Sequence, residues 1–216
     1  MRPLKHFLVR VPHVTQDTVT LNGEEIYIDT KWDEFKHRTM EGEVVGVPEK
    51  YDTGVEIGDT MYFHHHVILG GNHLVLQDGA DQLEESAKRG QWLDPNNDVY
   101  IVYYDGGHDP LSCQAYAHKS KTTGEVKLLG EWIFLTPAEE EQELKSDTLH
   151  LLEEKHEYNQ YGYIKYGSDR LEETGLVPGD KVIIRKNSDY RMEVDGESMF
   201  RVYLKHIHGK VIEAEA

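Results

Sequence analysis

The sequence is poor in cysteine, in long apolar runs and in positive charge, and each shortage excludes a class of protein. A single cysteine, Cys113, rules out an intrachain disulfide and fits a reducing compartment, so we expect a cytoplasmic protein. No apolar run approaches the roughly 20 residues of a transmembrane helix, and the N-terminus, MRPLKHFLVRV, lacks the features of a signal peptide. The 23 lysines and arginines against 40 aspartates and glutamates give a formal net charge of −17, which argues against binding to nucleic acid or to anionic membranes.

What the sequence does contain is one pattern of strands and turns that occurs twice. Residues 41–63, EGEVVGVPEKYDTGVEIGDTMYF, correspond to residues 160–184, QYGYIKYGSDRLEETGLVPGDKVII. In each copy an apolar strand led by a glycine, Gly42 or Gly162, is followed by a polar connector, a Gly-Asp turn and a second apolar strand. A spacing that is nearly constant between the two copies indicates an internal repeat.

The apolar stretches outside the two copies correspond as well. A strand closed by proline, which cannot donate a hydrogen bond to a sheet, precedes each copy, and a further strand follows each copy. These stretches are Leu4–Pro12 and Leu128–Pro137 before the copies, and Val99–Gly107 and Phe200–Ile212 after them. We therefore predict an all-β chain of two domains, residues 1–119 and 120–216, with a short helical insertion at about 74–97 in the first.

Three consecutive histidines, His64 to His66, lie in what we predict to be one long strand, Thr60–Leu69. Alternation along a strand places His64 and His66 on the same face. One interpretation is a zinc site with His73 as a third ligand, and the other is a polar strand face. Because the chain has no cysteine pair and no HExxH motif, we predict no metal. No base is identified for Cys113 and no phosphate-binding loop follows Gly70-Gly71, so we also predict no catalytic residues and no other cofactor.

Two long segments between predicted strands are unusual for compact β domains, in which such loops are usually functional or disordered. The first is Thr15–Met40 and the second is Thr136–Tyr158. In the second, Thr136 to Glu139 carries the signals of a helix start, and leucines farther along lie at helical spacing. The repeat instead predicts a long loop there, so helix and loop both remain open at this point.

Each half of the chain resembles the GroES-type co-chaperonins, which cap the folding chamber of a chaperonin. The resemblance rests on ordered stretches: RPLKHFLVRV, NGEEIYI, EGEVVGV and EIGDTMYF in the first half, and LGEWIFL, DTLHLLEE, YGYIKYG, VPGDKVII and FRVYLKHIHGKVIEAEA in the second. It covers nearly the whole chain except about residues 74–97. In its divergence the chain resembles viral co-chaperonins, and in its tandem form it resembles the double-domain co-chaperonins of plastids.

The resemblance implies two small, partly open GroES-like β-barrels and a binding function without chemistry. In the family, an apolar tripeptide on a mobile loop docks into a groove of the large chaperonin subunit. Carried over by position, this tripeptide is Ile26, Tyr27 and Ile28 in the first half. In the second half it lies at Leu149 and Leu151, with Leu152 in an alternative register. The implied partner is a GroEL-type chaperonin with ATP, and the implied assembly is a homo-oligomeric ring.

Two other functions fit parts of the same sequence. An oligomeric β-barrel structural or assembly protein uses such a fold without binding a chaperonin, and it requires both long segments to be ordered and packed. A metal-dependent enzyme acting on a small molecule requires a bound metal at His64 and His66. Our prediction is the co-chaperonin, in the cytoplasm, which for a viral protein is that of the host cell.

Overall fold

The computed structural model describes most of the chain, which is predominantly β-strand, as predicted. The described residues are 2–11, 18–21, 24–27, 39–68, 92–94, 97–107, 113–140 and 156–212. The chain divides into two compact units: unit 1 comprises Met1–Ala115 and Lys119–Gly124, and unit 2 comprises Tyr116–His118 and Glu125–Ala216. The domain limits expected at residues 119 and 120 stay a prediction. Within the described residues, no helix has both the length and the apolar character needed to cross a membrane.

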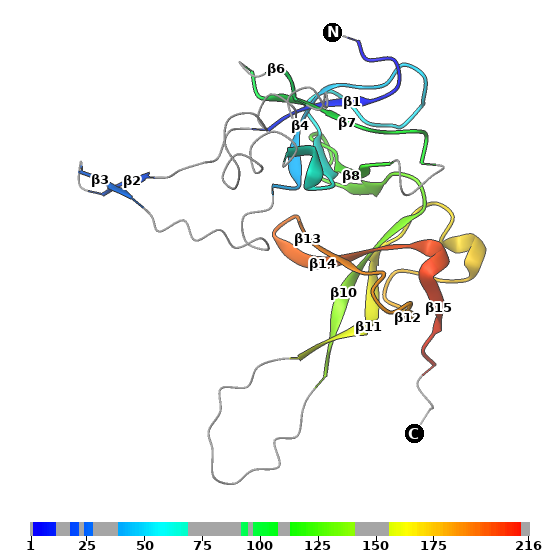
Figure 1. Ribbon diagram of the computed structural model, residues 1–216. Helices are drawn as coiled ribbons and strands as arrows, with labels where there is room; N and C mark the ends of the chain where they lie inside the picture. Colours follow the sequence, from blue (N-terminus) through cyan, green and yellow to red (C-terminus); the bar gives the residue numbers. More distant parts are fainter. Residues whose placement is uncertain are drawn as a thin grey trace. The chain divides into compact units, whose positions relative to one another are not determined.

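The first sheet has seven strands in the order β6-β7-β1-β4-β5-β8-β9 (Figure 1). They are β1 (Phe7–Arg10), β4 (Glu41–Gly46), β5 (Thr60–Phe63), β6 (Trp92–Asp94), β7 (Val99–Val102), β8 (Ala115–Lys119) and β9 (Val126–Leu128). Two further strands, β2 (Thr18–Leu21) and β3 (Glu24–Tyr27), form a separate two-stranded antiparallel sheet.

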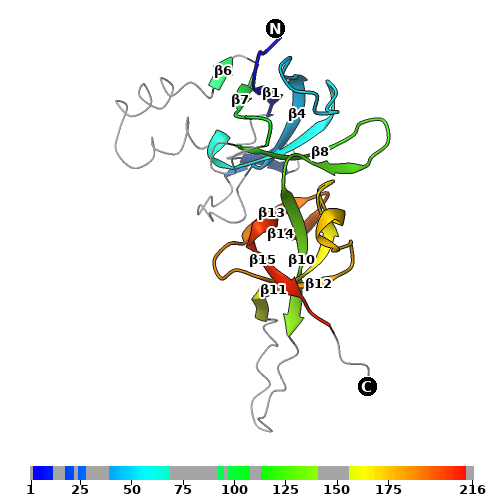
Figure 2. The same ribbon diagram turned by 90° about the vertical axis from the view of Figure 1, so that its right-hand side faces the viewer.

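The second sheet has six strands in the order β13-β14-β10-β11-β12-β15 (Figure 2). They are β10 (Trp132–Glu140), β11 (His156–Tyr166), β12 (Lys181–Ile184), β13 (Tyr190–Val194), β14 (Glu197–Tyr203) and β15 (Ile207–Lys210). Two short 3-10 helices accompany them, η1 (Glu172–Thr174) and η2 (Leu204–His206). Both sheets have two edge strands in the described chain, β6 and β9 in the first and β13 and β15 in the second, so neither closes on itself.

The two sheets share one order of strands. Six strands of the first sheet, all but β9, and the six strands of the second sheet can each be counted from first to sixth along the chain. In both sheets the strands then lie side by side in the order fourth, fifth, first, second, third, sixth. The register matches as well, because Val9 lies opposite Val44 and Leu135 lies opposite Ile164, each directly after an irregularity in the pairing. Stretches that correspond in the sequence therefore occupy matching positions in the two sheets.

The Gly-Asp turns of the two sheets are formed by the same hydrogen bonds. Gly58 and Gly179 have φ angles of 95° and 94°, in the region that glycine adopts without steric cost. The carboxylates of Asp59 and Asp180 each accept a hydrogen bond at Oδ2 from the backbone N–H three residues earlier, at 3.0 Å in both turns. Each glycine N–H also donates to a carbonyl of the preceding strand, at 2.8 and 2.7 Å. The turn thus needs both residues, glycine for its backbone and aspartate for its acceptor.

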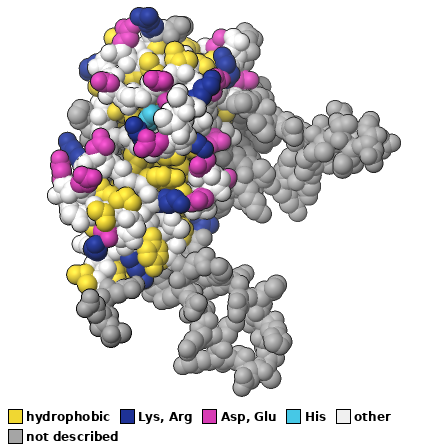
Figure 3. Space-filling view, turned by 180° about the vertical axis from the view of Figure 1, so that it is seen from behind, with side chains coloured by type: hydrophobic (Ala, Val, Ile, Leu, Met, Phe, Trp, Pro, Cys, Tyr) yellow, Lys and Arg dark blue, Asp and Glu magenta, His cyan; other side chains and the backbone are white. Residues whose placement is uncertain are grey.

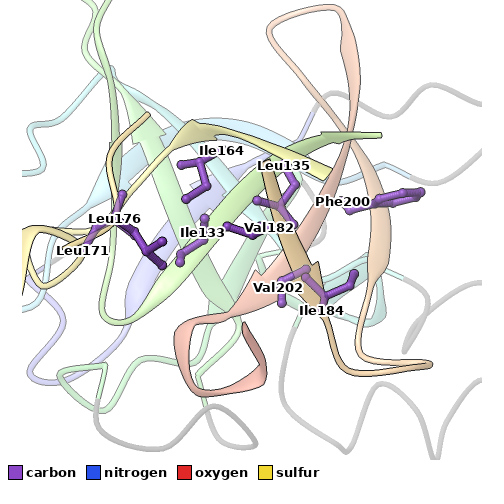
Figure 4. Close-up of a cluster of buried hydrophobic side chains, with 9 residues drawn as sticks. All are labelled: Ile133, Leu135, Ile164, Leu171, Leu176, Val182, Ile184, Phe200 and Val202. Carbon is purple, nitrogen blue, oxygen red and sulfur yellow. The ribbon is translucent and has the colours of Figure 1, made fainter. Parts of the chain in front are cut away.

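The core of unit 2 is a cluster of 9 buried apolar side chains (Figure 4). Most come from alternate positions of strands, since one face of a strand points into the core. They are Ile133, Leu135, Ile164, Leu171, Leu176, Val182, Ile184, Phe200 and Val202. Burying a large apolar side chain contributes about 1.5–3 kcal/mol, so this cluster contributes substantially to the stability of unit 2. In unit 1, fully buried side chains include Phe7, Val9, Val44, Met61, Phe63 and Val102.

The long strand predicted at Thr60–Leu69 is wrong beyond Phe63. Strand β5 ends there, and residues 66–68 are helical. The N–H of Val67 donates to the carbonyl of His64 at 3.0 Å, and the N–H of Ile68 donates to that of His65 at 3.1 Å. These local bonds satisfy the backbone in place of a sheet partner. Alternation of residue types could not reveal the change, because a run of three histidines has no apolar pattern.

The helix interpretation of residues 136–158 is wrong at both of its described ends. Thr136 to Glu140 belongs to β10, and His156 to Tyr158 belongs to β11. The two strands remain paired as far as Glu140 opposite His156. Pairing between strands outweighs local helix signals, which are a weak indicator against tertiary context. Residues 141–155 between these ends lie outside the described residues.

The predicted helical insertion at about 74–97 is described only in part. Its last residues form β6, in which Trp92 lies opposite Tyr100 of β7. The turn that follows includes a hydrogen bond from Asn97 Nδ2 to Asp94 Oδ2 at 2.7 Å. The stretch for which the sequence predicts a helix, residues 81–90, lies outside the described residues.

We expect Gly42→Ala and Gly162→Ala to destabilise their units for the same reason. A Cβ atom would lie 2.9 Å from the carbonyl oxygen of Arg10 in the first case and 2.9 Å from Cβ of Leu135 in the second. These neighbours belong to the backbone region of a paired strand and cannot move aside, so overpacking should lower the free energy of unfolding by about 1–3 kcal/mol. Denaturant unfolding measures the loss. Gly209→Ala is the control, because no atom lies within 4 Å of its added Cβ; an equal loss in all three variants would contradict this explanation.

We expect the stability of unit 2 to depend on acid through Asp180. Its carboxylate accepts hydrogen bonds from Lys210 Nζ at 2.7 Å and from the Val177 N–H at 3.0 Å, and these bonds hold its pKa below the ordinary value of 3.8. A pKa lowered by folding means that the stabilisation is complete above pH 3.8 and is lost as the pH falls through the folded-state pKa.

Asp180→Asn should therefore lower the free energy of unfolding at neutral pH and flatten its decline in acid. Urea unfolding of the full chain across this pH range measures both effects. Glu193→Gln removes one charge from an exposed position of β13 and serves as the control. If both variants show the same pH profile as the unmodified chain, the role assigned to Asp180 is incorrect.

Candidate functional site

The predicted chaperonin-binding residues belong to two segments that connect the first and second strands of the shared order. In unit 1 the segment runs from β1 to β4, and in unit 2 it runs from β10 to β11. The strands at the two ends of each segment are antiparallel neighbours in their sheet. Each segment therefore leaves its sheet and returns to it on adjacent strands.

The structure describes part of the predicted contact set. Ile26 and Tyr27 lie in β3, which pairs with β2 and is not a strand of the seven-stranded sheet. A two-stranded hairpin is at best marginally stable by itself in water. The pairing of β2 with β3 therefore presents only a small barrier to rearrangement against a partner. The other predicted contact residues lie outside the described residues: Ile28, Leu149, Leu151 and Leu152.

Both ends of the unit 1 segment are fixed to its sheet. The N–H of Val11 donates to the carbonyl of Asp98 at 3.0 Å, and the carbonyl of Met40 accepts from the N–H of Phe63 at 2.8 Å. The side chains of Val11 and Met40 are buried. Residues 12–17 and 28–38, between these anchors and the strands β2 and β3, lie outside the described residues.

The strands that hold the unit 2 segment, β10 and β11, remain paired over a longer stretch than β1 and β4, which hold the unit 1 segment. Strands β10 and β11 remain paired past Pro137, where the register shifts, to Ala138 opposite Tyr158 and Glu140 opposite His156. Ala138 is buried. The missing N–H of Pro137 falls at the irregularity, where a ladder hydrogen bond is not required. The segment therefore starts from the end of an extended strand pair.

A second candidate site is the turn after β5, where the structure gathers the three consecutive histidines. One ligating nitrogen from each of His64, His65 and His66 lies within 4.8 Å of the other two. The ring centroids are 4.3 to 4.6 Å apart, and the backbone N–H of His66 donates to His64 Nδ1 at 3.1 Å. The sequence placed His64 and His66 on the same face of a strand, whereas the turn brings His65 to them as well. His73, the third ligand considered from the sequence, lies outside the described residues.

His206 and Tyr104 have shifted pKa values, but neither belongs to a comparable cluster of side chains. Burial, followed by the nearby charges of Lys205 and Arg185, lowers the pKa of His206, which favours its neutral form. Burial also raises the pKa of Tyr104 to about 12, so this phenol remains protonated. In the part of the chain that the structure describes, the three consecutive histidines are the one group of three or more ligating side chains close enough together to hold a metal ion.

Sequence reasoning missed a stack of aromatic rings around Arg201 in unit 2. The guanidinium carbon of Arg201 lies 4.4, 4.3 and 4.7 Å from the ring centroids of Tyr116, Trp132 and Tyr190. The rings come from strands β8, β10 and β13, which are far apart in the sequence, so no local pattern indicates the cluster. Each such contact contributes about 0.5–2 kcal/mol. The cation between the rings is the side chain of Arg201 and not a ligand, so the stack stabilises the fold of unit 2.

Charged side chains of both signs are interspersed with apolar ones on the face shown in Figure 3. The large apolar side chains that are exposed come from several separate elements of the described chain. They are Leu4, Ile57, Leu93, Tyr163, Val177 and Ile212. Single exposed apolar residues are normal on protein surfaces, so they do not define a binding site by themselves.

A scan against models of known protein families finds no match for this chain, and a search of curated proteins finds none either.

Proposed function

We propose that this chain is a tandem co-chaperonin of the GroES type that caps a GroEL-type chaperonin ring and assists ATP-dependent folding. The observation that supports the proposal is topological. The two segments carrying the predicted contact residues connect the same pair of strands in two sheets of the same strand order. One segment would be an incidental loop, whereas two at matching positions indicate that this place in the fold is used for a purpose.

In this proposal each unit is one GroES-like, partly open barrel, and the chain acts by binding, as a non-enzyme in the cytoplasm. The sheet holds both ends of the unit 1 segment through Val11 and Met40. Its apolar residues, Ile26, Tyr27 and Ile28, enter a hydrophobic groove of the chaperonin. Ordering of the segment consumes part of the binding free energy, so each contact is weak and reversible.

Tight capping comes from several weak contacts acting together. When one segment of a homo-oligomeric ring is docked, the next is held near its own groove at a high effective concentration, so the whole assembly binds far more tightly than one segment. Release needs only a modest change in the groove, since each contact is individually weak. This suits a partner that changes shape with bound nucleotide, and it assigns the nucleotide chemistry to the chaperonin.

We expect Ile26→Ser/Ile28→Ser to abolish nucleotide-dependent binding to a GroEL-type chaperonin. Burying one isoleucine side chain contributes about 1.5–3 kcal/mol, and about 1.4 kcal/mol corresponds to a tenfold change in affinity. The double substitution should weaken each contact by about a hundredfold or more. Co-sedimentation with the chaperonin, with and without ATP, and the ATPase rate of the chaperonin measure the effect.

Leu4→Ser/Ile57→Ser is the matched control, because these residues of unit 1 are 65% and 67% exposed and lie outside both segments. It should bind as the unmodified chain does. If binding survives in the Ile26 and Ile28 variant but is lost on Leu149→Ser/Leu151→Ser/Leu152→Ser, the docking role belongs to unit 2. A stable oligomer that binds no chaperonin under any nucleotide condition would refute the proposal in favour of a structural or assembly protein.

A further inference from the structure

The turn that carries the three histidines is held firmly against the core of unit 1. On its N-terminal side Phe63 is fully buried, and the N–H of His64 donates to the carbonyl of Gln114 at 2.9 Å. On its C-terminal side Val67 is 1% exposed, and its N–H donates to the carbonyl of His64. The histidines are therefore gathered by the backbone of the turn, before any ligand takes part.

The spacing of the imidazoles is close to that of a metal site. Zinc–nitrogen bonds of about 2.0–2.1 Å place neighbouring ligands of a tetrahedral site about 3.3–3.4 Å apart. The ligating nitrogens of the cluster lie within 4.8 Å of one another. A histidine side chain has two rotatable bonds, so small rotations of the rings close the remaining gap while the backbone stays in place.

The three side chains also differ in accessibility in a way that suits a bound ion. His65 is 6% exposed, His64 is half-buried and His66 is exposed. An ion held among them is protected on the inner side and reachable from solvent at His66. The hydrogen bond from the His66 N–H to His64 Nδ1 orients the His64 ring. If His64 coordinates the ion through Nδ1, the metal bond takes the place of this hydrogen bond. If it coordinates through Nε2, the proton lies on Nδ1, which then no longer accepts the hydrogen bond.

Comparison of the two units indicates that the cluster is not a requirement of the fold. The matching position in unit 2, directly after β12, holds Arg185, Lys186 and Asn187. The second sheet therefore forms the same strand order without histidines there. The formal charge of −17 additionally favours the approach of cations to the protein.

We propose that His64, His65 and His66 bind one divalent transition-metal ion through three imidazole nitrogens, with a further position open to water or another ligand. Imidazole is a preferred ligand of zinc, copper and nickel, whereas magnesium and calcium prefer oxygen ligands. This site is independent of chaperonin binding, since it uses none of the residues in the two segments. It differs from the prediction made from the sequence, which was that the protein has no metal site.

The test compares His66→Ala with His208→Ala in the full chain. Both side chains are exposed, but His208 lies on β15 of unit 2 and is not one of the three clustered histidines. Calorimetric titration with Zn²⁺ and absorption spectroscopy with Co²⁺ measure affinity, stoichiometry and coordination geometry. Loss of groups that merely orient metal ligands weakens binding by about 10–100-fold, so loss of a ligand should weaken it by about tenfold or more.

We expect the unmodified chain and His208→Ala to bind one Zn²⁺ with the same affinity and to show a Co²⁺ spectrum typical of nitrogen ligands at low coordination number. His66→Ala should bind at least tenfold more weakly, and His64→Ala/His66→Ala should not bind at this site. Zn²⁺ should raise the melting temperature of the unmodified chain but not that of the double variant. Equal weakening in His66→Ala and His208→Ala, or no saturable binding by the unmodified chain, would overturn the proposal.

Discussion

The aspartate of the Gly-Asp turn is the constraint on which both units depend. In unit 1 the buried carboxylate of Asp59 accepts from the N–H of Glu56 at 3.0 Å and from the N–H of Lys121, just past β8, at 2.9 Å. In unit 2 the carboxylate of Asp180 accepts from Val177 in its own turn and from Lys210 at the end of β15. In each unit one carboxylate therefore joins the turn before the third strand to the sixth strand or to the residues that follow it.

This connection explains why the order of strands is maintained although much of the surrounding sequence differs. The third and sixth strands are neighbours in both sheets, and the turn aspartate fixes them at one end. The glycine before it reverses the chain within the space available, with φ near 95° in both copies. Loss of the carboxylate leaves backbone N–H groups without acceptors at a cost of about 1–3 kcal/mol for a buried group, so few other residues fit the position.

The two units differ mainly at the places to which we assign the chaperonin contacts and the metal site. Unit 1 has the β2–β3 hairpin between its first two strands, and unit 2 has a strand pair that continues to Glu140 and His156 at the same place. The histidine cluster follows the third strand of unit 1, where unit 2 has Arg185. Segments attached to a rigid sheet are free to diverge, since the sheet is stabilised without them.

The sequence was sufficient to predict the elements whose cause is local. Both Gly-Asp turns, the strands beside them and the all-β class follow from glycine, aspartate and alternating apolar residues, and the structure confirms them. The sequence could not show where β5 ends, because this depends on which backbone partners exist beyond Phe63. For a similar reason it left helix and loop open from Thr136 onwards, since pairing with a distant strand is not visible in a local window.

In the candidate sites, too, features with a local cause could be predicted from the sequence, and features that depend on distant residues could not. The sequence predicted Ile26 on a long segment between strands, and it gave no sign that β3, the strand in which Ile26 lies, pairs with β2. The metal interpretation of His64 and His66 relied on strand alternation, whereas a turn brings the three side chains together. The stack around Arg201 combines side chains from four strands, and only the folded chain places them within reach of one another.

That stack also gives unit 2 a distinct optical property. Trp132 is 4% exposed, and its ring centroid lies 5.0 Å from that of Tyr116 and 5.1 Å from that of Tyr203. At such separations, light absorbed by the two tyrosines passes efficiently to the indole, whose emission in a dry environment lies at shorter wavelength than in water. The emission of this indole under tyrosine excitation therefore reports whether unit 2 is folded, once Trp32 and Trp92 have been replaced so that Trp132 is the remaining tryptophan.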